Sequence, residues 1–206
     1  MKKDSFVKDA IVLTAITLVS GLLLGGVYGL TKQRIYEANM ASTIESYHKV
    51  MDAESYDEES LTDALEKAKT DGTVSADNGG AELLSAVAAK DAGGEAIGYI
   101  VKGQAAGYGG NVIVVVGVTP DLKVSGISFP ETAGLGQKAT EPEFYKQFAG
   151  KGTKLSVKKG GGAGENEIDA ISGATITSTA VTNTVNAATQ FIGDYVLEQG
   201  GGGKNG

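Results

Sequence analysis

A cluster of hydroxyl side chains near the C-terminus is the part of this sequence best suited to chemistry. It comprises Ser172, Thr175, Thr177 and Ser178, with the small residues Gly173 and Ala174 between them. Apolar residues then recur at three- and four-residue spacing between Val181 and Val196, which predicts a helix. The unpaired N–H groups and the positive dipole end of a helix N-terminus hold a phosphate well. The alternative is that the hydroxyls only cap the helix.

The wider pattern around the hydroxyls is more specific. Asp169 followed by Ser172-Gly173-Ala174-Thr175-x-Thr177 resembles the flavinylation motif of the FMN-binding domain family. In that family the Thr that closes the motif carries FMN through a phosphoester bond, which a separate flavin transferase makes. The resemblance implies one covalent FMN on Thr175 and recognition of Asp169 by the transferase. It also implies that the cofactor is lined by Ser172, Gly173, Ala174, Ile176 and Thr177.

Two glycine-bearing stretches occur in the order that the same family shows, although either alone would be typical of a plain loop. Gly107-Tyr108-Gly109-Gly110 precedes a run of valines, and Glu131-Thr132-Ala133-Gly134-Leu135-Gly136 follows Phe129. The family usually has Pro at the position of Ala133. The resemblance implies that the flavin is also contacted by Glu131, Thr132, Gly134, Leu135 and Gly136. Glycines let the backbone approach the ring edge, while Leu135 and Ile176 would supply apolar contact.

The composition argues against several other kinds of site. A formal net charge of -7 is unfavourable for binding nucleic acid, which needs a basic face. The absence of Cys excludes disulfides, Cys-ligated iron–sulfur clusters and Cys-based zinc sites. The one His, His48, is far from any candidate nucleophile in the sequence. The sequence therefore predicts neither an independent catalytic residue nor a metal site.

Residues 10–30 carry no charge and are numerous enough to cross a bilayer as a helix, with a cleaved signal peptide as the alternative. Basic residues flank this stretch at Lys2, Lys3 and Lys8 before it and at Lys32 and Arg34 after it. The positive-inside rule then favours a cytoplasmic N-terminus of residues 1–9 and an external domain. Within the span, Thr17, Gly21, Gly25 and Gly29 recur every fourth residue. Such small-residue stripes predict a packing face for another membrane subunit.

The remainder of the chain predicts an α+β fold with an antiparallel sheet and a C-terminal helix. We expect a membrane-proximal helical segment over 31–70, an FMN-binding domain over 71–199 and a flexible tail over 200–206. Strands are expected at 83–89, 96–102, 111–118, 123–129 and 155–158, and a short helix at 142–148. A Ser60-x-x-Asp63 capping signal predicts another helix. Loops are expected at 52–59, 71–80 and 160–164.

Within the FMN-binding domain family, the anchor and the order of motifs resemble the G subunits of Rnf ion-translocating electron transport complexes. The resemblance implies a single-pass protein of the cell membrane whose covalent FMN relays electrons. The complex moves electrons between ferredoxin and NAD and couples this to sodium or proton translocation. Its implied partners are the other membrane subunits and the flavin transferase. The alternatives are an NqrC-like subunit of the sodium-pumping NADH:quinone reductase, a tethered flavin-binding domain that passes no electrons, and an anchor without a cofactor.

Overall fold

The computed structural model describes residues 11–23, 42–57, 59–130 and 137–198, which fall into two compact units, Met1–Thr43 and Ile44–Gly206. In the first unit, residues 11–23 form a helix with exposed apolar side chains, such as Leu22 at 70% exposure. Among the helices built from the described residues, none has the length and apolar character needed to span a membrane. Gly25, Gly29 and much of the expected span 10–30 lie outside the described residues, so the span stays a prediction.

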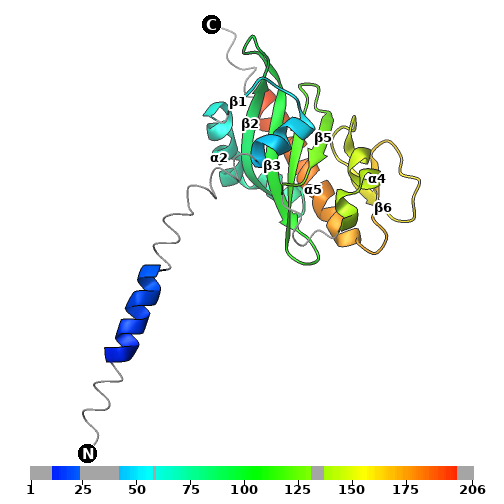
Figure 1. Ribbon diagram of the computed structural model, residues 1–206. Helices are drawn as coiled ribbons and strands as arrows, with labels where there is room; N and C mark the ends of the chain where they lie inside the picture. Colours follow the sequence, from blue (N-terminus) through cyan, green and yellow to red (C-terminus); the bar gives the residue numbers. More distant parts are fainter. Residues whose placement is uncertain (1–10, 24–41, 58, 131–136, 199–206) are drawn as a thin grey trace, which may run out of the picture. The chain divides into compact units, whose positions relative to one another are not determined.

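The second unit is built on an antiparallel sheet of five strands, each paired with its neighbours in sequence (Figure 1). The strands are β1 (Ser55–Asp57), β2 (Glu82–Lys90), β3 (Ala96–Ala106), β4 (Asn111–Val118) and β5 (Val124–Ser128). The α+β fold and the four expected sheet strands are confirmed. The short edge strand β1 replaces part of the loop expected at 52–59, because it pairs with the last residues of β2.

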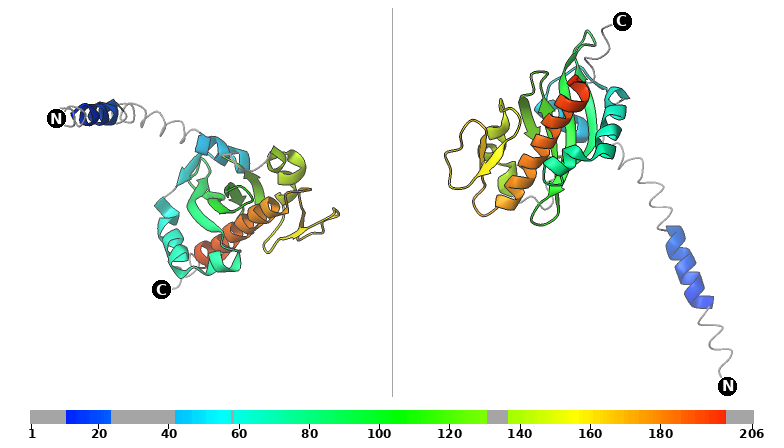
Figure 2. Two further views of the ribbon diagram at one scale, coloured as in Figure 1. Left: turned by 90° about the horizontal axis from the view of Figure 1, so that it is seen from below. Right: turned by 180° about the vertical axis from the view of Figure 1, so that it is seen from behind.

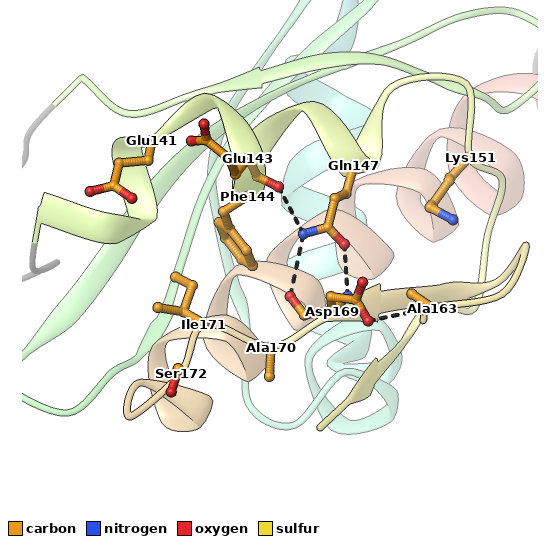
Figure 3. A pocket seen from close by; sticks show the side chains of 10 residues that line it. All are labelled: Glu141, Glu143, Phe144, Gln147, Lys151, Ala163, Asp169, Ala170, Ile171 and Ser172. Atoms are coloured by element: carbon orange, nitrogen blue, oxygen red, sulfur yellow. Dashed lines mark hydrogen bonds between the residues drawn. The ribbon is translucent and has the colours of Figure 1, made fainter. Parts of the chain in front are cut away.

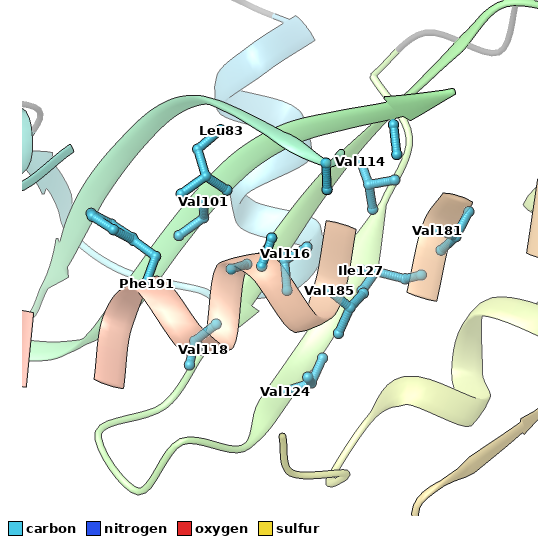
Figure 4. Close-up of a cluster of buried hydrophobic side chains, with 14 of the residues drawn as sticks. Leu83, Val101, Val114, Val116, Val118, Val124, Ile127, Val181, Val185 and Phe191 are labelled. Atoms are coloured by element: carbon cyan, nitrogen blue, oxygen red, sulfur yellow. The ribbon is translucent and has the colours of Figure 1, made fainter. Parts of the chain in front are cut away.

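Helix α5 (Thr175–Phe191) covers one face of the sheet, crossing β3 and β4 (Figure 2). Figure 4 shows Val181, Val185 and Phe191 of α5 against the inward side chains of the strands. The helix carries no charged residue over its length, which is typical of a helix buried nearly all round. Its buried hydroxyls at Thr182, Thr184 and Thr189 donate hydrogen bonds to carbonyls one turn back, so they cost little to bury.

The other face of the sheet is covered by the helix of residues 42–50, through its part from Ile44 onward. Tyr47 and Val50 pack there against Val87, Ile100 and Val115. The contact is close because the sheet has glycines beneath it. A side chain at Gly117 would place its Cβ 2.9 Å from the Val50 carbonyl oxygen. The valine run of β4 is therefore buried on both faces, as its continuous apolar pattern predicts.

Two local expectations before β2 are wrong. Ser60 does not cap α2 (Thr62–Asp71), which begins after Leu61 without a side-chain cap. Instead the Asp57 carboxylate accepts the N–H groups of Glu59 and Ser60 and so organises the short η1 (Glu59–Leu61). The loop expected at 71–80 contains a helix, α3 (Thr73–Asp77), because Gly72 at φ +72° ends α2 in the left-handed region and lets a new turn start.

A smaller layer follows β5 and leads to α5. The helix expected at 142–148 is confirmed as α4 (Pro142–Tyr145) and η3 (Lys146–Phe148), after η2 (Gln137–Thr140). The expected strand at 155–158 is confirmed as β6 (Ser156–Lys158), but it does not join the large sheet. It pairs in parallel with β7 (Glu167–Asp169), which the sequence did not predict.

A tyrosine–carboxylate contact ties the C-terminal end of the fold to α2. The Tyr195 hydroxyl, in the π-helical turn η4 (Ile192–Leu197), donates a hydrogen bond to the Asp71 carboxylate. This bond and burial raise the pKa of Tyr195 from its ordinary value of 10.0 to about 12. The bonds from Tyr195 and Thr73 lower the pKa of Asp71.

We predict that Tyr195→Phe lowers the free energy of unfolding and flattens its alkaline dependence. Because the folded-state pKa is raised, the tyrosine's contribution is fully present below pH 10.0 and is lost as the pH rises towards about 12. Urea unfolding at a series of pH values from about 8 to about 12 measures the difference between wild type and variant. Tyr108→Phe is the control, since Tyr108 is 86% exposed. Equal alkaline slopes for Tyr195→Phe and wild type would contradict the assignment.

Candidate functional site at the start of helix α5

The N-terminus of α5 lies at the end of the sheet that carries the other two motifs. At the opposite end of the helix, Gly193 lies against Leu122 in the β4–β5 turn. Midway along it, Gly103 of β3 lies against Thr184. The start of α5 therefore points to the end where β3 turns into β4 and β5 ends. The turn of residues 107–110 lies at that end, closed by a hydrogen bond from the Gly107 N–H to the Gly110 carbonyl.

The segment that follows β5 is the second predicted motif. Its members Glu131, Thr132, Gly134, Leu135 and Gly136 lie outside the described residues. Their contact with a flavin therefore stays a prediction. What the structure does place is the departure point of this segment, since β5 ends at Ser128 and Phe129 packs partly against the core.

The four hydroxyls of the first motif differ sharply in exposure. Thr175 is the first residue of α5 and is half-buried, while Ser172 is exposed. Thr177 is only 3% exposed and Ser178 is completely buried. A group that attaches from solvent can therefore reach Ser172 or Thr175 but not the other two. Ile176, expected to give apolar contact, is 53% exposed beside them.

The alternative that these hydroxyls cap the helix is wrong. The N-cap residue is Ala174, and no side chain makes a capping hydrogen bond there. Ser178 faces backwards: its Oγ accepts the Ile171 N–H at 3.0 Å and donates to the Ala174 carbonyl at 3.0 Å. The first turn of α5 also lacks an acidic residue. Its N–H groups and its positive dipole end are thus available to an anion.

The turn before the helix has a strict conformational demand. Gly173 has φ +78°, in the left-handed region, and the Ala174 N–H donates back to the Ile171 carbonyl at 2.9 Å. Glycine adopts this conformation without the steric cost that a side chain brings. The glycine of the Ser-Gly-Ala-Thr sequence is therefore explained by the turn that aims Thr175 outward.

Thr175 lines a cavity of about 340 Å³ whose other walls suit a phosphate. The cavity is bounded by Lys159, Gly160 and Gly161 on one side and by Ser172 and Gly173 on the other. An ammonium group, glycine backbone and an uncapped helix start meet here around one hydroxyl. This set of donors fits the phosphate end of an FMN attached to Thr175.

A larger cavity of about 620 Å³ adjoins the first, sharing Ala170, Ile171 and Ser172 with it (Figure 3). Its walls mix apolar side chains, Phe144 and Ile171, with polar ones from α4, η3 and β7. A flat ring with polar edges needs both kinds of contact. The two cavities together thus offer room for a phosphate and for a larger attached group.

Three side chains that the sequence analysis missed hold this site together. Gln147 of η3 accepts the Asp169 N–H at 2.7 Å and donates to the Glu143 and Asp169 carbonyls (Figure 3). Asn186 of α5 brackets Leu155, accepting its N–H and donating to its carbonyl, both at 2.8 Å. Ser178 is the third. A sequence signal existed for Asn186 and Ser178, because each is polar on an otherwise buried helix.

Comparison with known proteins follows the same region of the chain. A family model described as FMN-binding domain matches residues 107–190. The G subunit of the Na(+)-translocating ferredoxin:NAD(+) oxidoreductase complex of Acetobacterium woodii is 46% identical over 116 residues, covering 53% of this chain and 55% of the relative. The G subunit of an ion-translocating oxidoreductase complex from Aliivibrio fischeri is 30% identical over 195 residues, covering 89% of each chain.

The extent of these matches differs. The chain spans about half the length of the more identical relatives, such as that of Acetobacterium woodii, and nearly the whole length of the Aliivibrio fischeri protein. The crystal structure of Shewanella oneidensis NqrC matches with a TM-score of 0.46 at 22% identity, over 56% of this chain and 59% of that one. That score is below the level that establishes a common fold.

We predict that Ser178→Ala destabilises the domain by about 1–3 kcal/mol, because it leaves the buried Ile171 N–H without its acceptor. Thr179→Ala is the matched control, since Thr179 is exposed on the same helical turn. Chemical unfolding followed by circular dichroism measures both. The role given to Ser178 is wrong if the two variants unfold at the same denaturant concentration.

Proposed function

The chain belongs to the family of G subunits of ion-translocating oxidoreductase complexes, and from this premise we propose that it is an electron-relay subunit bearing one covalent FMN on Thr175. The complex would transfer electrons between ferredoxin and NAD and couple the transfer to sodium or proton translocation. This subunit would have no independent catalysis. The observation that carries the proposal is that the reachable Thr175 hydroxyl lies at an uncapped helix start beside Lys159.

The residues around Thr175 have separate tasks in this proposal. The N-terminal turn of α5 and Lys159 would balance the charge of the phosphoester. Ser172, Gly173, Ala174, Ile176 and Thr177 would form the near wall of the site, with Thr177 acting from within the core. Glu131, Thr132, Gly134, Leu135 and Gly136 would complete it from the segment after β5. FMN, when bound, supplies the ability to accept and return electrons, and the protein sets its potential through these surroundings.

Maturation and assembly complete the proposal. A flavin transferase would attach the FMN, using Asp169 as part of its recognition signal. Residues 10–30 would anchor the chain in the cell membrane, with the domain outside the cytoplasm and the stripe of Thr17, Gly21, Gly25 and Gly29 against another subunit of the complex. Outside the cell a noncovalent flavin would be lost by dilution, so a covalent bond has a clear benefit there.

An NqrC-like role in a sodium-pumping NADH:quinone reductase is the second candidate, because it would use the same motif and anchor. The two roles differ in the electron donor. Ferredoxin-dependent NAD reduction in membranes supports the first role, whereas NADH-dependent quinone reduction supports the second. A tethered flavin domain that passes no electrons would keep its flavin oxidised in both assays.

We predict that Thr175→Val abolishes the FMN adduct, because no other hydroxyl of the motif is reachable in the same place. Co-expression with a flavin transferase, peptide mapping by mass spectrometry and in-gel flavin fluorescence measure the adduct. Thr177→Val is the matched control and should retain it, since Thr177 is 3% exposed. In membranes, Thr175→Val should lose ferredoxin-dependent NAD reduction while the complex still assembles. An adduct on Thr177, or one that survives Thr175→Val, would exclude Thr175 as the acceptor.

We also predict that the domain faces away from the cytoplasm. The chain has no cysteine, so a single one introduced at Ala76, which is exposed on α3, reports on topology. In intact cells Ala76→Cys should react with a membrane-impermeant thiol reagent. Ser5→Cys should react only after the membrane is broken. The reverse pattern would place the domain inside and remove the retention argument for covalent FMN.

A further inference from the structure

Residues 159–164, here called the glycine segment, join two parallel strands by an unusually short route. Lys158 at the end of β6 lies opposite Asp169 at the end of β7. Parallel neighbours ordinarily need a crossover of about a dozen residues or more. The chain reverses here through three glycines, Gly160, Gly161 and Gly162, with φ of 90°, 83° and 77°. Because glycines bring no side chains to pack, the segment cannot fix its own position.

Charged side chains outside the glycines hold the segment instead. The Asp169 carboxylate accepts the Ala163 N–H at 2.9 Å, and the Glu167 carboxylate accepts the Gly164 N–H at 2.9 Å. The Lys158 ammonium donates to the Gly162 carbonyl at 2.8 Å and lies 3.4 Å from Glu167. The Gly164 N–H and Lys158 hold the pKa of Glu167 below its usual range. A segment expected to be a flexible loop is thus bonded at three consecutive residues.

A fourth brace comes from the layer before β6. The Lys151 ammonium donates to the Gly164 and Glu165 carbonyls at 2.9 and 2.8 Å. Ordering glycines costs more conformational entropy than ordering any other residue. So many partners for an exposed segment indicate that its position matters. The position it is given forms the wall of the 340 Å³ cavity across from Thr175.

Asp169 is the brace that connects this wall to the hydroxyl motif. Its backbone N–H is fixed by Gln147 at 2.7 Å, so its carboxylate is aimed at Ala163 (Figure 3). We propose that Asp169 is a positioning residue that holds the glycine segment in place, so that Lys159 and the Gly160 and Gly161 backbone face the phosphate of the group on Thr175. This inference rests on the proposed function. It gives Asp169 an indirect part in recognition, in which the transferase reads the held segment rather than the carboxylate.

The hydrogen bond from Ala163 needs an acceptor oxygen and not a negative charge, which makes the inference testable. Asp169→Asn keeps that oxygen, whereas Asp169→Ala removes it. With unmodified full-length chain, flavin transferase and its flavin donor, we expect Asp169→Ala to lower the rate of adduct formation by about tenfold or more, as is typical of residues that orient a binding group. Asp169→Asn should restore the rate to near that of wild type.

Hydrogen exchange of the unmodified chain supplies a readout independent of the flavin. Exchange at the Ala163 amide should accelerate in Asp169→Ala and stay slow in Asp169→Asn, while exchange within α5 is unchanged in both, which shows that the domain is folded. Lys159→Met should slow adduct formation and leave exchange at Ala163 as in wild type. Lys146→Met, at an exposed lysine of η3 that lines neither cavity, is the matched control.

The outcomes separate the two proposals. Loss of flavinylation in Asp169→Asn with slow exchange at Ala163 would mean that the transferase reads the carboxylate itself, and would overturn the inference. Wild-type rates in Asp169→Ala, or in Lys159→Met, would also overturn it. If the wild-type chain receives no adduct on Thr175, the proposed function fails, whatever the Asp169 variants do.

Discussion

The structure around Thr175 depends on satisfying the backbone polar groups of an irregular segment that is partly buried. Between η3 and α5 the chain has only two short strands, so few N–H and C=O groups find partners in a ladder. Side chains take over this task at three places: Asn186 at Leu155, Gln147 at Asp169 and Ser178 at Ile171. Each removes the cost of an unpaired buried donor, which is larger than the net gain of an ordinary hydrogen bond.

Two of these three side chains belong to α5, which therefore serves the core and the site together. Its apolar face is fixed against the five-stranded sheet by Val181, Val185 and Phe191. That docking sets where Ser178 and Asn186 lie, and through them where the segments before and after the glycine segment lie. An uncharged helix can do this because its polar side chains are short and find partners within the fold. The position of Thr175 is then a consequence of core packing.

Much of this could be predicted from the sequence, for physical reasons that differ between elements. The valine run of β4 and the alternation of β5 are local patterns, so their strands were expected nearly to the residue. β1 and β7 are too short to show any period and exist only through their partners. The motif singled out Thr175, but only burial separates it from Thr177. The bracket between Asn186 and Leu155 joins residues far apart in sequence, and no local pattern contains it.

The openness of the site and the proposed covalent bond fit one another. Thr175 is half-buried, Ser172 and Lys159 are exposed, and the cavity wall consists partly of glycine backbone. A phosphate held only by such solvent-facing charges gains little, because water screens them and competes for the same hydrogen bonds. A deep pocket would bind a flavin more tightly but would bury the ring edge through which electrons must pass. A single bond from a threonine retains the group while the surroundings stay shallow, so the fold needs to supply orientation more than affinity.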